Sequence, residues 1–117
     1  METIRELTGS GELNELLTDA SERPVLLFKH STACPVSAAA MEELQRFART
    51  DDARKVRIAY VKVIEQRPVS NEIAERLQVK HESPQSILVK DGRVTWHASH
   101  WNVTADALRE AVRLATK

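Results

Sequence analysis

The chain has 117 residues, in which 17 Lys or Arg are balanced by 17 Asp or Glu. This length is typical of one domain with its own hydrophobic core, and we expect a single domain over residues 1–117. The balanced charge argues against a nucleic-acid-binding surface, and no apolar run approaches the ~20 residues of a membrane span, so we expect neither partner. The N-terminal segment lacks the pattern of a secretory signal, and we expect a cytoplasmic protein and a monomer.

The first half of the chain alternates predicted strands and helices. In chain order these are a short strand at residues 3–7, a helix at 10–20, a strand at 25–28, a helix at 35–50, a strand at 56–63 and a helix at 68–77. The continuous apolar run at 25–28 is typical of a strand covered on both faces, as in a parallel sheet. Ser10 is a good helix cap, and Pro35 suits the first position of a helix because its missing N–H costs nothing there.

The predicted helices at residues 10–20 and 35–50 each carry an apolar stripe at helical spacing. The stripe of the first helix is Leu13, Leu16, Leu17 and Ala20. The stripe of the second is Ala38, Met41, Leu44, Phe47 and Ala48. We expect both stripes to face the sheet.

The second half of the chain predicts a hairpin followed by a helix. Residues 85–89 and 93–98 are predicted to be antiparallel strands, because Asp91-Gly92 between them is a strong hairpin signal. Thr104 then caps a final helix. The order β-α-β-α-β-α-β-β-α, with crossovers first and a hairpin last, resembles that of the thioredoxin fold. We therefore expect an α/β protein of thioredoxin-like fold, with a central mixed sheet and helices on both faces.

The candidate reactive group is Cys34, the single cysteine of the chain. It lies at the predicted start of the helix that Pro35 opens, where unpaired backbone N–H groups and the helix dipole stabilise an anion such as a thiolate. A lone cysteine is more often a small buried hydrophobe, but this one lies among small or polar residues rather than in the apolar strand at 25–28. With no second cysteine, a mixed disulfide formed here has to be released by an external thiol.

Two neighbours of Cys34 are candidates to adjust its thiolate. Ser37 stands where dithiol enzymes of this fold have a second cysteine; it either donates a hydrogen bond to the thiolate or is an ordinary first-turn residue. His30 ends the preceding strand and either lies close enough to act on the thiol or has a structural role. The spacing of cysteine and histidines predicts no metal site. A hydrogen-bonded structural role is expected for the remaining histidines, which are His81, His97 and His100.

Ser83-Pro84 precedes the predicted strand at 85–89, where a protein of thioredoxin fold has a cis proline opposite its active cysteine. Only X–Pro bonds adopt the cis form readily, and we expect this bond to be cis. Arg67 is a candidate groove cation for a carboxylate-bearing thiol, or else a solvated loop residue. Trp101 precedes the last helix, and we expect it to pack rather than to flank a ligand groove.

Four segments together resemble the monothiol bacilliredoxin (YtxJ-type) family. They are Phe28-Lys29-His30-Ser31-Thr32-Ala33-Cys34-Pro35-Val36-Ser37, Arg67-Pro68-Val69-Ser70-Asn71, His81-Glu82-Ser83-Pro84-Gln85 and Ala98-Ser99-His100-Trp101. They follow one another in family-like order and spacing. The family often has Thr immediately before the cysteine and Ile after the proline, where this chain has Ala33 and Val36. This departure bears on how the thiolate is adjusted and not on which residue is the nucleophile.

The resemblance implies a thiol–disulfide oxidoreductase that removes bacillithiol from protein mixed disulfides. It implies that Cys34 is the catalytic thiol, that Ser37 replaces a resolving cysteine and that Pro84 is the cis proline. Bacillithiol then acts as a low-molecular-weight co-substrate, with no bound cofactor, and S-bacillithiolated proteins are the clients. The residues expected around the thiolate are Pro35, Val36, Ser37 and His30, and those expected in the substrate groove are Thr32, Arg67, Ser83 and Pro84.

Two other functions stay open on the residues alone. One is a non-catalytic thioredoxin-like binding or adaptor domain, whose thiol does not react with disulfides. The other is an enzyme of another kind, such as a conjugating transferase or a reductase of arsenate or peroxide. The latter ranks lower, because no cluster of arginines for an oxyanion is evident beside Cys34.

Overall fold

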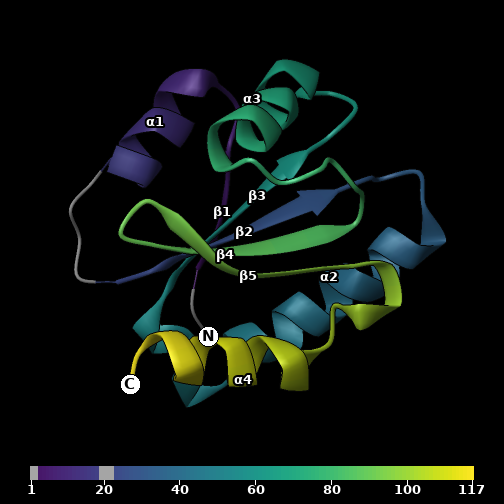
Figure 1. Cartoon of the computed structure of the whole chain (residues 1–117). Helices are drawn as coiled ribbons and strands as arrows, with labels where there is room; N and C mark the ends of the chain where they lie inside the picture. The colour runs from purple at the N-terminus through teal and green to yellow at the C-terminus, as the bar shows by residue number, and fades with distance from the viewer. Residues whose placement is uncertain (1–2, 19–22) are drawn as a thin grey trace.

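The computed structural model describes residues 3–18 and 23–117 and shows a five-stranded sheet between two pairs of helices (Figure 1). In chain order, with η marking a 3-10 helix, the elements are β1 (Ile4–Glu6), α1 (Ser10–Thr18), β2 (Val25–His30), α2 (Pro35–Ala48), η1 (Asp51–Lys55), β3 (Arg57–Lys62), α3 (Arg67–Leu77), β4 (Gln85–Lys90), β5 (Arg93–Ser99), η2 (His100–Asn102) and α4 (Ala105–Ala115). The strands and α-helices follow the order expected from the sequence. The described part of the chain contains no helix that could cross a membrane.

The sheet is mixed, with the strand order β1-β3-β2-β4-β5. β3 pairs in parallel with both β1 and β2, whereas β4 runs antiparallel to β2 and to β5. The predicted hairpin is confirmed: Asp91 and Gly92 both have positive φ angles, 54° and 77°, as a type I′ turn requires. Lys29 pairs with Gln85 across β2 and β4, so the C-terminal end of β2 lies beside the start of β4.

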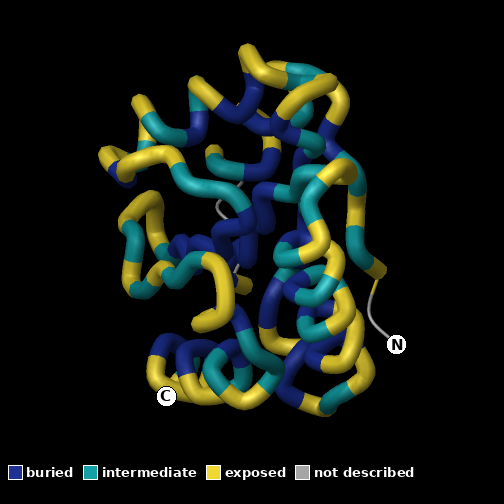
Figure 2. Tube along the Cα trace, turned by 90° about the vertical axis from the view of Figure 1, so that its right-hand side faces the viewer, coloured by how far each residue is buried: buried dark blue, intermediate teal, exposed yellow. Residues whose placement is uncertain are grey.

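Helices α1 and α3 cover one face of the sheet, and α2 and α4 cover the other (Figure 1). The side chains of β2 alternate between the two cores. Leu26 and Phe28 lie in the core of the α2–α4 side, and Val25 and Leu27 in that of the α1–α3 side. Figure 2 shows the centre of the trace buried and the outer sides of the helices exposed. The apolar run in β2 is thus covered on both faces, as predicted.

The start of α4 is held by two oxygen atoms. Thr104 Oγ1 accepts a hydrogen bond from the N–H of Ala107 at 3.1 Å, so its predicted capping role is confirmed. Glu43 Oε1, from α2, accepts from the N–H of Ala105 at 2.9 Å. Both contacts satisfy amides that have no partner within the helix, and the second also joins α4 to α2.

Two helix predictions need correction. In α2, Ala38 is exposed, whereas Ser37 and Ala40 face the core. The buried side of the first turns is centred on a serine, which an apolar pattern does not register. In α1, Ser10 is the first helical residue rather than a cap before it, and the predicted contribution of Ala20 lies outside the described residues.

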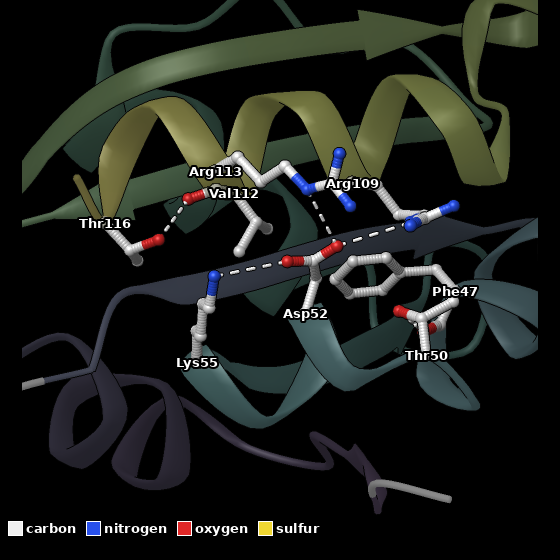
Figure 3. A network of polar contacts seen from close by, with 8 residues as sticks. All are labelled: Phe47, Thr50, Asp52, Lys55, Arg109, Val112, Arg113 and Thr116. Carbon is white, nitrogen blue, oxygen red and sulfur yellow. Dashed lines mark hydrogen bonds and ion pairs between the residues drawn. The ribbon is translucent and has the colours of Figure 1, made fainter.

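The short helix η1, which the sequence analysis did not predict, is held to α4 by Asp52. The Asp52 side chain is buried between Lys55 and two arginines of α4 (Figure 3). Its Oδ2 accepts from Arg109 Nε at 3.3 Å and from Arg113 Nε at 3.1 Å, and its Oδ1 from Lys55 Nζ at 3.2 Å. Burial acts to raise the pKa of Asp52, but the hydrogen bonds of Lys55 and Arg109 and the charge of Arg113 outweigh it and lower the pKa. Asp52 is therefore an ionised link between the two helices.

Candidate active site at the thiol-bearing end of the sheet

Several segments meet at one end of the sheet, because β2, β3 and β5 end there and β4 begins there. Cys34 follows β2, and Pro84 immediately precedes β4. Backbone hydrogen bonds tie the segments together: the N–H of Val63 donates to the carbonyl of His30 at 2.9 Å, and that of His100 to the carbonyl of Pro84 at 3.0 Å. The topology therefore gathers the predicted site residues at this end.

Cys34 is the N-cap residue of α2 and is partly exposed. Its carbonyl accepts the first hydrogen bond of the helix, from the N–H of Ala38 at 3.0 Å. The amides of Val36 and Ser37 come before that bond, and Pro35 has no N–H, so these two amides form the positive end of the helix beside the thiol. Within the described residues the Cys34 side chain makes no capping hydrogen bond. The sulfur is thus available to a partner from outside.

Ser37 is fully buried and ties the loop before Cys34 to the first turn of α2. Its Oγ accepts a hydrogen bond from the N–H of Ser31 at 2.9 Å and shares another with Nδ1 of His30 at 2.8 Å. The sequence alone left open whether this hydroxyl donates a hydrogen bond to the thiolate or belongs to an ordinary first-turn residue of the helix. In the described structure its hydrogen bonds go to the loop and to β2, and donation to the thiolate stays a prediction.

His30 lies within a small aromatic group at the end of β2. Its ring stacks on Phe28 with centroids 5.8 Å apart and meets the ring of Tyr60 edge-on at 6.4 Å. Burial, aided by the charge of Lys62, lowers the pKa of His30 against the opposing charge of Glu65. The lowered pKa favours the neutral imidazole at neutral pH, and an action of His30 on the thiol stays a prediction.

The expected groove residues lie at the same end of the sheet. The Ser83–Pro84 bond is cis, which confirms that prediction. Thr32 is exposed, and its hydroxyl donates to Glu65 Oε2 at 3.4 Å. Arg67 is the first residue of α3 and is exposed. Ser83 Oγ is buried and has no hydrogen-bond partner within the described residues.

The prediction that Trp101 packs is wrong, because its side chain is 70% exposed. Trp101 lies in η2, which is attached to the neighbouring loop through the backbone of His100, and the core does not cover its ring. Ile64, in the loop after β3, is 54% exposed. Both large apolar side chains therefore meet solvent at the thiol-bearing end.

Lys29 is a buried charged residue of this end of the sheet that was not predicted from the sequence. The strand β2 extends two residues past the apolar run, to His30, and Lys29 is fully buried in it. Its Nζ lies 3.0 Å from Nδ1 of His81, which confirms the hydrogen-bonded role predicted for that histidine. The alternation of β2 holds the missed signal, since Lys29 follows Val25 and Leu27 on one face of a doubly covered strand.

The arrangement suits the exchange of one sulfur at a time. It offers a partly exposed thiol at the positive end of a helix, at the same end of the sheet as a cis proline and two exposed apolar side chains. Across residues 3–18 and 23–117, no three His, Cys, Asp or Glu side chains gather in a way that could hold a metal ion.

Comparisons with known proteins agree with this geometry. A family model described as monothiol bacilliredoxin BrxC matches residues 5–108, a range that contains every residue of the site. The chain is similar to a solved protein described as having a thioredoxin fold, with 28% identity, a TM-score of 0.81 and 92% of each chain covered. It is also similar to the thioredoxin of Malassezia sympodialis (14% identity, TM-score 0.81, 100% of this chain and 94% of that one). For Fasciola hepatica thioredoxin the identity is 18% and the TM-score 0.75, with 95% of this chain and 98% of that one covered. The two thioredoxins show the shared fold alone.

Proposed function

Because the chain belongs to the monothiol bacilliredoxin family, we propose that it uses Cys34 to remove bacillithiol from mixed disulfides with client proteins. Family membership and the thioredoxin fold give the chain a thiol redox role, with protein substrates and thiols as partners. The observation that carries the finer proposal is the position of its single cysteine, partly exposed at the start of α2.

In the first step, the Cys34 thiolate attacks the bacillithiol sulfur of the mixed disulfide. A disulfide forms between Cys34 and bacillithiol, the original disulfide breaks, and the client sulfur leaves as a thiolate that takes up a proton. The amides at the start of α2 stabilise the attacking anion. The step exchanges one disulfide for another, so it needs no external oxidant or reductant.

In the second step, a free low-molecular-weight thiol attacks Cys34–S–S–bacillithiol at the bacillithiol sulfur. Cys34 leaves as a thiolate, and the two small thiols depart as a disulfide. A thiolate stabilised by the helix end is a good leaving group, which favours this step. Ser37 has no sulfur and cannot release the bound thiol from within the chain.

The surroundings of Cys34 would decide which sulfur is attacked. Attack on the client sulfur would join Cys34 to the client, so the small thiol has to be oriented. We assign this task to Thr32, Arg67, Ser83 and Pro84, which lie at the thiol-bearing end. The reaction fits a monomer in the cytoplasm, where free thiols are maintained.

The test is mass spectrometry of a bacillithiolated client mixed with wild type or Cys34→Ser. We expect wild type to free the client and to gain the mass of one bacillithiol, and Cys34→Ser to do neither. Wild type alkylated with iodoacetamide is the matched control, because it blocks the sulfur without changing the sequence. Deconjugation by Cys34→Ser at the wild-type rate would contradict the proposal. Inertness of wild type would favour a non-catalytic binding domain.

A further inference from the structure

Lys29 is a charged residue at a position where the fold could hold an apolar one. It lies in β2, after Leu27 on the α1–α3 side of the sheet, and is completely buried. Loss of water around the amine lowers the pKa of Lys29 to about 8. A methionine of similar length would fill the same space without this cost. The amine therefore calls for an explanation other than packing.

The Lys29 amine is directed at one histidine. Its Nζ lies 3.0 Å from Nδ1 of His81, and Ser70 Oγ, near the start of α3, lies 3.4 Å from the same nitrogen. Both partners carry protons to donate, so Nδ1 is the acceptor and the ring proton is on Nε2. His81 is exposed as a whole, but partial loss of hydration of its ring, followed by the charges of Lys29 and Arg67, lowers the pKa of His81, which agrees with a neutral ring.

His81 lies in the loop of residues 78–84, which joins α3 to β4 and ends at the cis proline Pro84. On the side of β5, this loop is attached by the hydrogen bond from the N–H of His100 to the carbonyl of Pro84. On the side of α3, it is attached through the His81 ring. Lys29 thus connects β2, the strand that leads to Cys34, with the loop that carries the cis proline.

We propose that Lys29 is a positioning residue for thiol exchange at Cys34: through His81 it holds the loop of residues 81–84 in place and so determines how tightly a mixed disulfide binds. The inference rests on the proposed function of Cys34. A purely structural residue loses stability and activity together when it is replaced. For Lys29, we expect stability and activity to change in opposite directions. Replacing the residue removes the cost of burying the amine, but the loop loses a hydrogen bond that holds it in place.

The test compares full-length wild type with Lys29→Met, His81→Leu and His81→Asn. Asparagine offers an amide oxygen near the place of Nδ1 and can accept from Lys29, whereas leucine cannot. Lys90→Met is the matched control, since it replaces a lysine at the far end of β4. Each protein is assayed for kcat and KM with a bacillithiolated client, for urea unfolding, and for hydrogen–deuterium exchange of residues 79–85.

We expect Lys29→Met and His81→Leu to raise KM about tenfold and to change kcat by less than about threefold. A rise of about tenfold is what the loss of one hydrogen bond between the loop and the bound mixed disulfide would cause. Residues 79–85 exchange faster in both variants, while β3 exchanges as in wild type. The urea midpoint of Lys29→Met is at or above that of wild type. His81→Asn restores most of the wild-type KM, and Lys90→Met leaves KM unchanged.

Unchanged exchange at residues 79–85 in both Lys29→Met and His81→Leu overturns the inference, because exchange is measured without substrate. Faster exchange with an unchanged KM overturns it as well, and so does a Lys29→Met variant whose activity and urea midpoint fall together. A wild type that leaves its client bacillithiolated refutes the proposed function, and with it the binding half of this inference. The exchange data still decide whether Lys29 holds the loop.

Discussion

A polar side chain sealed from water has to find its hydrogen bonds inside the protein, and near Cys34 this requirement falls on Ser37. The hydroxyl satisfies the N–H of Ser31 and pairs with the ring of His30. A single oxygen atom thereby fixes the loop that delivers Cys34 to its helix. Residue 37 therefore has a structural role, because it holds the loop before Cys34, in addition to the absence of a resolving thiol at this position.

Ser37→Ala is expected to destabilise the fold by about 1–3 kcal/mol, because it leaves the N–H of Ser31 and the ring of His30 without their partner. Urea unfolding monitored by circular dichroism measures the change. Thr32→Ala is the control: it removes an exposed hydroxyl from the same loop and should alter stability by less than about 0.5 kcal/mol. Equal stability of wild type and Ser37→Ala would show that the two hydrogen bonds contribute nothing.

At this scale, the sequence reveals residues whose role follows from local backbone chemistry. The place of Cys34 before a helix-opening proline was predictable because an N-cap depends on adjacent residues, whereas the cis bond of Pro84 was predicted from the position of the cis proline in the thioredoxin fold. Lys29 was not predicted, since its partner is 52 positions away. The exposure of Trp101 was equally hidden, because it depends on whether another element covers the ring.

Among the elements, η1 and α4 are joined by a charge rather than by an apolar contact alone. Asp52 is buried and accepts hydrogen bonds from Lys55, Arg109 and Arg113 (Figure 3). A buried carboxylate is tolerable only when its oxygens are satisfied, and here both are. The connection places the C-terminal helix against the chain that leads into β3.

Asp52→Asn is expected to cost about 1–2 kcal/mol, because it removes the charge that these three cations share. The pKa of Asp52 is lowered from 3.8 in the folded chain, so its contribution is complete above that value and is lost as the pH falls through the lower folded value. The difference between variant and wild type in urea unfolding should therefore be constant from about pH 7 to 5 and should shrink below about pH 4. Asp51→Asn, an exposed neighbour, is the control. A difference that stays constant into acid would contradict the ionised link.

The principal elements could be predicted because their signals are periodic or local. The run in β2, the Asp91-Gly92 turn and the Thr104 cap each specify one conformation. The helix η1 is too short for a period, and its stability comes from arginines in α4, far along the chain. In α2, the predicted stripe missed Ser37 because its burial depends on hydrogen bonds that hydropathy does not describe.

On the scale of the whole molecule, exposed large apolar side chains of the described residues lie at both ends of the sheet. Trp101 and Ile64 lie at the thiol-bearing end, with side chains 70% and 54% exposed. Leu114, 62% exposed, lies towards the other end, where Lys90 donates to the carbonyl of Ala115. We expect a client protein bound at this end to contact both apolar side chains, which offer contact area that a small disulfide does not use.

Trp101→Ala is expected to raise KM for a bacillithiolated protein about tenfold, in the range of an aromatic residue at the centre of an interface. The rate with a small-molecule disulfide should change less than about twofold. Steady-state kinetics with both substrates measure the effects. Leu114→Ala removes a comparable exposed side chain at the other end and should leave both values unchanged. Equal losses with the two substrates would show that Trp101 acts on the thiol itself and not on the client.

The single cysteine has a kinetic consequence for the proposed cycle. Release of bacillithiol from Cys34 requires a collision with a free thiol from solution, so the half-time of this step doubles whenever the concentration of free thiol is halved. A depleted cell would accumulate the bacillithiol-bound form, and a replete cell would clear it. The fraction of protein with Cys34 in a disulfide with bacillithiol would then report the concentration of free thiol in the cell.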